Sequence, residues 1–85
     1  MNITDAELLK TLLLAAREVN ADHRVHLARC ERNFHALERV YNGRHANARL
    51  GVIALLEHAK TQAAASERLV HDLEQLLERA TKEPA

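Results

Sequence analysis

The sequence predicts an all-α protein in which two long antiparallel helices form a coiled-coil-like hairpin, within a single domain spanning residues 1–85. Three observations support this fold class. Apolar residues recur at alternating spacings of four and three in both halves of the chain. The two patterns are separated by Asn42 and Gly43, which tolerate left-handed backbone and often end a helix. The connection is short, so the helices should be antiparallel neighbours.

The first helix is expected over residues 4–41. Thr4 and Glu7 fit a capping box, and Ile3 and Leu8 occupy the positions of a hydrophobic staple. From there the heptad seam, its a and d positions, runs through Leu9, Leu13, Ala16, Asn20, His23, Leu27, Cys30, Phe34, Leu37 and Tyr41. The sequence therefore predicts one continuous helix with a narrow contact surface.

After a turn over residues 42–45, the second helix is expected over residues 46–81 and stops before Pro84. Its seam runs through Val52, Leu56, Ala59, Ala63, Ser66, Val70, Leu73 and Leu77. The layers in the middle of the hairpin are small, and the run from Ala63 to Ser66 would let another helix approach closely. Close packing inside a homodimer is an equally good interpretation.

The register follows from pairing seam residues whose numbers add up to 86, which makes almost every layer apolar. The two seam residues with uncharged polar side chains, Asn20 and Ser66, then lie opposite each other. Such a pair costs stability, but it penalises shifted registers that would bury the amide without a partner. Alternatively, Asn20 breaks the helix and Asp22 caps a new one, which would give three helices with a kink near Ala21.

The apolar stripe is wider than a two-helix seam, because six large residues occupy the adjacent g positions. A stripe of this width suits a four-helix bundle, completed by a second hairpin or by another helical protein. The expected interface comprises Leu9, Leu12, Leu13, Ala16, Val19, Asn20, Leu27, Phe34, Val40, Leu55, Leu56, Ala63, Ser66, Leu69, Val70, Leu73, Leu76 and Leu77.

Composition narrows the choice of partner and compartment. The formal charge is zero, so the total does not favour nucleic acid or an anionic membrane. Cys30 is the only cysteine, which excludes an intramolecular disulfide and favours a reducing compartment. The chain has no apolar run of about 18 residues and no basic amino-terminal segment of a signal peptide. We therefore expect a cytosolic protein.

A second hypothesis is a dimeric RNA-binding hairpin. Between Asp22 and Arg49, six arginines face three acids, a net charge of +3 that places basic residues near the turn. These arginines could follow an RNA backbone: Arg24, Arg29, Arg32, Arg39, Arg44 and Arg49. Glu31 and Glu38 interrupt the set, and the chain has no aromatic platform for stacking on bases. A mixed-charge solvated surface is the preferred interpretation.

A third hypothesis is a metal-dependent regulator. His23, His26 and Cys30 follow one another at spacings of three and four, on one side of a helix, and all three are zinc or copper ligands. A structural site usually needs a fourth ligand, and the nearest candidates, Glu57 and His58, fall at outward positions. A buried thiol beside two surface or interface histidines is the simpler interpretation, and we expect no cofactor.

No catalytic motif is present. The sequence shows no Gly-rich phosphate loop, no Ser/His/Asp set and no Glu-x-x-His pair of the kind that binds di-iron centres in helical bundles. Two packed helices also form no deep pocket. We therefore expect the protein not to be an enzyme.

Three segments resemble the small co-chaperones of type III secretion needle subunits: residues 12–18 (LLLAARE), the Asn42-Gly43-Arg44 turn and residues 53–59 (IALLEHA). The charge-rich stretch from Asp22 to Arg32 departs from that pattern. The resemblance implies a cytosolic two-helix hairpin that pairs with a larger helical-repeat chaperone to keep an aggregation-prone subunit in solution. The leading hypothesis is therefore a non-enzymatic interaction protein: an adaptor, a co-chaperone or an inhibitor.

Overall fold

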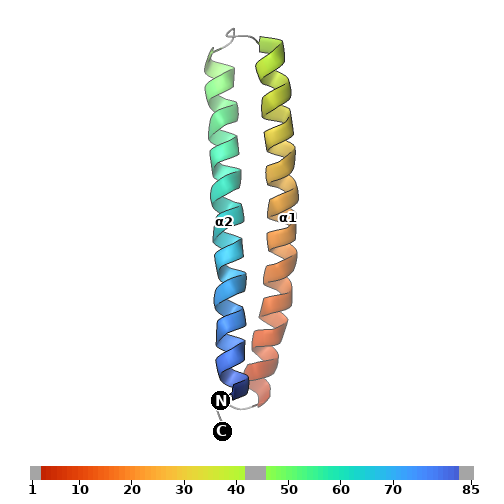
Figure 1. The fold of residues 1–85 in the computed structure, drawn as a ribbon, viewed down its shortest axis with the longest axis vertical. Coiled ribbons are helices and arrows are strands. Elements are labelled where there is room, and N and C mark those ends of the chain that lie inside the picture. The colour runs from red at the N-terminus through yellow and green to blue at the C-terminus, as the bar shows by residue number, and fades with distance from the viewer. Residues whose placement is uncertain (1–2, 42–45, 83–85) are drawn as a thin grey trace.

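The protein is a hairpin of two long helices. A computed structural model describes the backbone of residues 3–41 and 46–82, and the side chains of residues 5–40 and 46–82. Helix α1 spans Ile3–Tyr41 and helix α2 spans Ala46–Lys82. The two run antiparallel, side by side along their whole length, so that the start of α1 and the end of α2 lie at the same end (Figure 1). The all-α hairpin predicted from the heptad spacing is confirmed.

Helix α1 is continuous through Asn20 and Asp22, so the alternative of three helices with a kink near Ala21 is wrong. An asparagine at a seam position costs little helix propensity compared with the packing on either side of it. Helix α1 begins one residue before the expected start, and α2 ends one residue after the expected end; differences of this size are usual at helix ends. The side chain of Thr4 and the turn at residues 42–45 lie outside the described residues.

The register predicted by the sum of 86 is confirmed at the open end of the hairpin. Leu13, Ala16 and Val70 form a buried cluster, with Leu73 and Leu77 packed against it. The pairs of Leu13 with Leu73 and of Ala16 with Val70 both satisfy the sum. The Ser66 hydroxyl lies 3.0 Å from Oδ1 of Asn20, so the expected polar pair also forms.

The core is thin. The buried seam residues of the described chain are Leu13, Ala16, Leu56, Ala59, Ala63, Ser66 and Val70. Most of the other seam positions, including Leu27, Cys30 and Phe34, are only half-buried, because each helix has a single neighbour to cover it. The alanine layers add little, since burial stabilises by about 25 cal/mol per Å² of apolar surface.

The elongated shape explains this incomplete burial. The Cα positions extend over 63 × 14 × 14 Å with a radius of gyration of 18.9 Å. A compact domain of the same length would have a radius of gyration of about 12 Å. The hairpin therefore presents much of its side-chain surface to whatever surrounds it.

Candidate protein interface

One long side of the hairpin carries large apolar side chains that neither helix covers. We call this surface the g flank, and it consists of the six g-position residues Leu12, Val19, Val40, Leu55, Leu69 and Leu76. In an antiparallel pair the g positions of the two helices lie on the same side, so these residues share one surface. All six are exposed, from 46% at Leu76 to 74% at Val40. Exposed apolar side chains that gather on one side of a protein are consistent with a binding surface.

The g flank contains a groove near the open end of the hairpin. The groove has a volume of about 310 Å³ and is lined almost entirely by apolar atoms of Leu12, Ala15, Ala16, Val19, Ser66, Leu69 and Leu73. Its lining combines small residues, Ala15, Ala16 and Ser66, with larger side chains of both helices. The groove is wide open, so it suits protruding apolar side chains of another protein rather than an enclosed small molecule.

The opposite side of the hairpin has a different chemistry. Arg17 and Glu74, both at e positions, form an ion pair across the helices at 4.0 Å. Nearer the turn, Arg49 donates a hydrogen bond from Nε to the Glu38 carboxylate, and its second nitrogen lies 2.8 Å from the same oxygen. These partly exposed pairs are worth at most about 1 kcal/mol each. They nevertheless make this side a polar surface, which leaves the g flank as the apolar side.

Polar residues interrupt the g flank in its middle. His26, Asn33 and Gln62 occupy the remaining central g positions: Gln62 and His26 lie between the apolar group at the open end and Leu55, and Asn33 lies between Leu55 and Val40. Polar residues therefore separate the apolar group at the open end from Leu55, and Leu55 from Val40. Any partner that covers its whole length must accommodate this pattern.

The small residues of the middle layers mostly pack inside the hairpin. Ala59, Ala63 and Ser66 are buried against α1, whereas Ala64 and Ala65 are exposed on the outside of α2. The small residues at every third or fourth position of this segment therefore let α2 approach α1 closely within the chain.

His23 introduces a polar atom into these layers. Its Nδ1 is buried and has no hydrogen-bond partner among the described residues. A buried nitrogen without a partner costs about 1–3 kcal/mol. His23 lies three residues after Asn20, at the next seam position. The pair of Asn20 and Ser66 and this unpartnered nitrogen therefore belong to one section of the core that contributes little stability.

The candidate metal ligands come together only in part. Cys30 Sγ lies 3.7 Å from Nε2 of His26, one helical turn away, while His23 belongs to the interhelix seam. Within residues 5–40 and 46–82, no group of three or more histidine, cysteine or acidic side chains is arranged to hold a metal ion. The arrangement is that of a thiol and an imidazole in weak contact.

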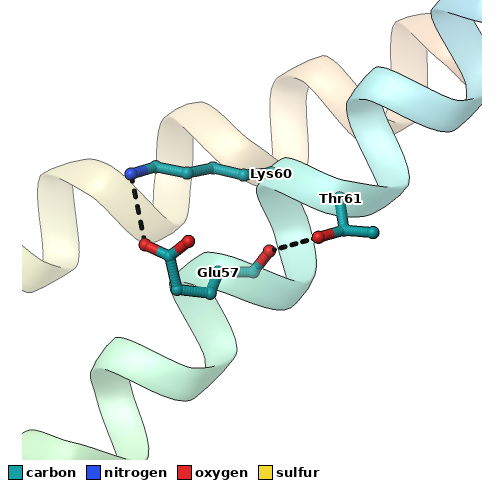
Figure 2. A network of polar contacts seen from close by, with 3 residues as sticks. All are labelled: Glu57, Lys60 and Thr61. Atoms are coloured by element: carbon teal, nitrogen blue, oxygen red, sulfur yellow. Dashed lines mark hydrogen bonds and ion pairs between the residues drawn. The ribbon is translucent and has the colours of Figure 1, made fainter.

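Glu57, one of the two nearest candidates for a fourth ligand, contacts other residues of α2. Lys60 Nζ lies 3.4 Å from the Glu57 carboxylate, and the Thr61 hydroxyl donates a 3.0 Å hydrogen bond to the Glu57 carbonyl oxygen (Figure 2). All three residues belong to consecutive turns of α2, so the network links α2 only to itself. The pair of Glu57 and Lys60 supports an exposed helix by a few tenths of a kcal/mol.

The candidate nucleic-acid residues do not lie along one track. Arg24 is at an e position, Arg29 at a c position, and Arg32 and Arg39 at f positions on the outside of α1. Arg49 is paired with Glu38. Arg44 lies outside the described residues. The described arginines therefore point to several sides of the hairpin.

Four further large apolar residues are exposed although they lie outside the seam and g positions: Leu8, Leu14, Val25 and Leu50. Leu8 occupies a c position and extends the g flank at the open end, whereas the other three occupy b or f positions on outer surfaces. Only their hydropathy could have identified them, because they do not follow the heptad pattern.

Comparisons with models of protein families, with curated proteins and with solved structures gave no match. In the part of the chain that the structure describes, neither helix is long and apolar enough to span a membrane. The arrangement of residues on the hairpin is therefore the basis for a functional proposal.

Proposed function

We propose that the chain is a non-enzymatic protein–protein interaction module that binds through its g flank, as an adaptor, a co-chaperone or an inhibitor. One observation carries the proposal: six large apolar side chains are exposed together on one side of a hairpin whose other side is polar and ion-paired. Burying such side chains is favourable by about 1.5–3 kcal/mol each when burial is complete.

The proposal assigns the seam and the flank different roles. The buried seam residues hold the two helices in register, as the contact between Asn20 and Ser66 illustrates. The g flank supplies the binding energy, and the groove supplies a concave surface into which side chains of the partner fit. We assign no catalytic step to the chain, and we place it in the cytosol because its single cysteine favours a reducing compartment.

The resemblance of residues 12–18 and 53–59 to needle-subunit co-chaperones is consistent with a partner of helical repeats. Such a partner would present apolar side chains from a concave surface, which is a common way to bind an amphipathic helix. RNA binding is less well supported, because the described arginines lie on several sides of the hairpin and Arg49 is already paired.

The test compares two sets of substitutions. The flank variant replaces four residues by Gln: Leu12, Val19, Leu69 and Leu76. The control variant replaces Leu14, Val25 and Leu50 by Gln; these residues are similarly exposed but lie at b and f positions outside the g flank. Solution mass is measured by light scattering over a concentration series, and helix content by circular dichroism. If the flank binds protein, the wild type will either associate above the chain mass of 9.6 kDa or aggregate as a partnerless chain. The flank variant will be monomeric and well dispersed, and the control variant will behave as the wild type.

A wild type that stays a well-folded, well-dispersed monomer up to millimolar concentration would overturn the proposal. The same conclusion would follow if the control variant changed the solution mass as much as the flank variant. Aggregation that the flank variant alone relieves would support binding to a different protein, and co-purification would then identify it.

A further inference from the structure

We infer that the g flank is covered by a second copy of this chain, packed so that the two turns lie at opposite ends of a four-helix bundle. The inference rests on the proposed function and adds the partner and its orientation. Its two-fold axis crosses the hairpin between His26 and Gln62, whose levels differ by two residues, or about 3 Å, in the register of 86. In this arrangement α1 packs against α1 of the second copy, and α2 against α2, both antiparallel.

The pattern of the flank matches itself in this orientation. An axis between these two levels brings Leu12 to within about two residues of the level of Val40 of the second copy, and Leu55 equally close to the level of Leu69. Leu12 and Val40 therefore cover each other, as do Leu55 and Leu69, while His26 and Gln62 each meet their own copy and Val19 meets Asn33. The groove at the open end then receives Val40 and Leu55 of the second copy, the two apolar residues that the hairpin itself leaves most exposed within the flank.

A position of the axis half a heptad nearer the open end matches less well on α1. Moving the axis half a heptad along α1 would place Leu12 opposite Asn33 of the second copy and Val19 opposite His26. Each such layer would bury a polar side chain against an apolar one without a hydrogen-bond partner, which costs free energy. In the preferred register the only mixed layer on α1 pairs Val19 with Asn33.

Charge distinguishes opposite turns from turns at the same end. Residues 29–58, at the turn end, carry five arginines and three glutamates, a net of +2. Residues 1–17 and 67–85, at the open end, carry five basic and seven acidic side chains, a net of −2. A bundle with both turns at one end also buries the g flank, but it places like-charged ends together. Solvent and salt screen these charges, so they select the orientation while apolar burial supplies the affinity.

The border of the flank supports the same orientation. Asp22 and Arg29 occupy c positions beside the flank. Asp22 lies four residues before His26 and Arg29 lies three residues after it, so their distances from His26 along the helix differ by one residue, or about 1.5 Å. With opposite turns, Asp22 of each copy faces Arg29 of the other. With turns at the same end, Asp22 would face Ala65 and Arg29 would face His58. Both charged side chains are exposed in the hairpin.

Cross-linking in solution tests the orientation directly. All variants carry Cys30→Ala, so that each has a single introduced thiol, and a short bismaleimide joins thiols that lie close together. We expect His26→Cys to cross-link to itself. Leu12→Cys alone will not, but it will do so when mixed with Val40→Cys. The matched control is Val25→Cys, which is adjacent and exposed but at an f position on the outside of α1.

Charge reversal provides an independent test that does not depend on Cys30. Asp22→Arg or Arg29→Asp alone should raise the dimer Kd by about tenfold, which corresponds to about 1.4 kcal/mol. The double variant should return the Kd close to the wild-type value. The two residues are seven positions apart on one helix, too far for direct contact within the chain, so rescue would report contact between copies.

The possible outcomes distinguish a wrong orientation from a wrong function. Cross-linking of Leu12→Cys with Leu76→Cys, without self-linking of His26→Cys, would mean turns at the same end and overturn this inference while leaving the proposed function intact. A wild type that aggregates without forming a dimer would also overturn it, since the flank would then belong to a different protein. A well-folded monomer would overturn both.

Discussion

The Ser66 hydroxyl and Oδ1 of Asn20 lie 3.0 Å apart, although the two residues are separated by 46 positions in the sequence. The hydroxyl oxygen is also 3.1 Å from the carbonyl oxygen of Ala63. A hydroxyl has one proton to donate, so the two acceptors share it. This contact forms a polar layer between the helices, and we propose that the layer favours the observed register.

Asn20→Leu should raise the free energy of unfolding and abolish a unique assembly. Leucine would add apolar burial to the seam, while removal of the amide would also remove the penalty on shifted registers. Thermal melting at fixed protein concentration measures the first effect, and sedimentation velocity measures the second. A variant that sediments as the same single species as the wild type would show that Asn20 does not select the register.

His23→Leu should raise the free energy of unfolding by about 1 kcal/mol at neutral pH, because Nδ1 is buried without a partner. Urea denaturation followed by circular dichroism measures the change. His71→Leu is the control, since His71 is exposed on α2, and we expect it to change stability by less than about 0.5 kcal/mol. A destabilised His23→Leu protein would indicate that the imidazole has a hydrogen-bond partner in solution.

Ala59→Leu should lower the free energy of unfolding by about 1–3 kcal/mol, because Ala59 is only 1% exposed and the added carbons would force the helices apart. The matched control is Ala64→Leu, on the exposed side of the same helix, which should be nearly neutral. Equal effects of the two substitutions in a urea titration would contradict the observed helix spacing.

Gly51→Ala should raise the free energy of unfolding by about 0.5–1 kcal/mol. Gly51 lies within α2, and a methyl group added there would meet nothing within 4 Å. The gain therefore comes from helix propensity alone. The reverse change at a nearby exposed position, Ala54→Gly, should lower stability by a similar amount. If Gly51→Ala lowered the melting temperature, the residue would have to be covered by another molecule in solution.

Most of the fold could be predicted from the spacing of apolar residues. The steps of four and three identify one side of each helix, and a short connection allows only an antiparallel pairing. The register followed from the match of Asn20 with Ser66, which the 3.0 Å contact confirms. These features depend on local spacing, or on the sum of 86 between paired seam residues, so they could be predicted from the sequence alone.

The features that depend on how individual side chains are oriented required the tertiary structure. The pairing of Arg49 with Glu38 removes one arginine from the candidate nucleic-acid set, and it depends on how two side chains bend toward each other. The unpartnered Nδ1 of His23 depends on side-chain orientation in the same way.

The sequence by itself determined which residues form the seam and which lie beside it, because helical periodicity assigns every residue a direction. Only the tertiary structure decided that the seam closes while Leu12, Leu69 and the rest of the g flank remain exposed. The physical reason is that one neighbouring helix covers about one side of another. A stripe three positions wide is therefore half buried within the hairpin, and its other half is left for a second molecule.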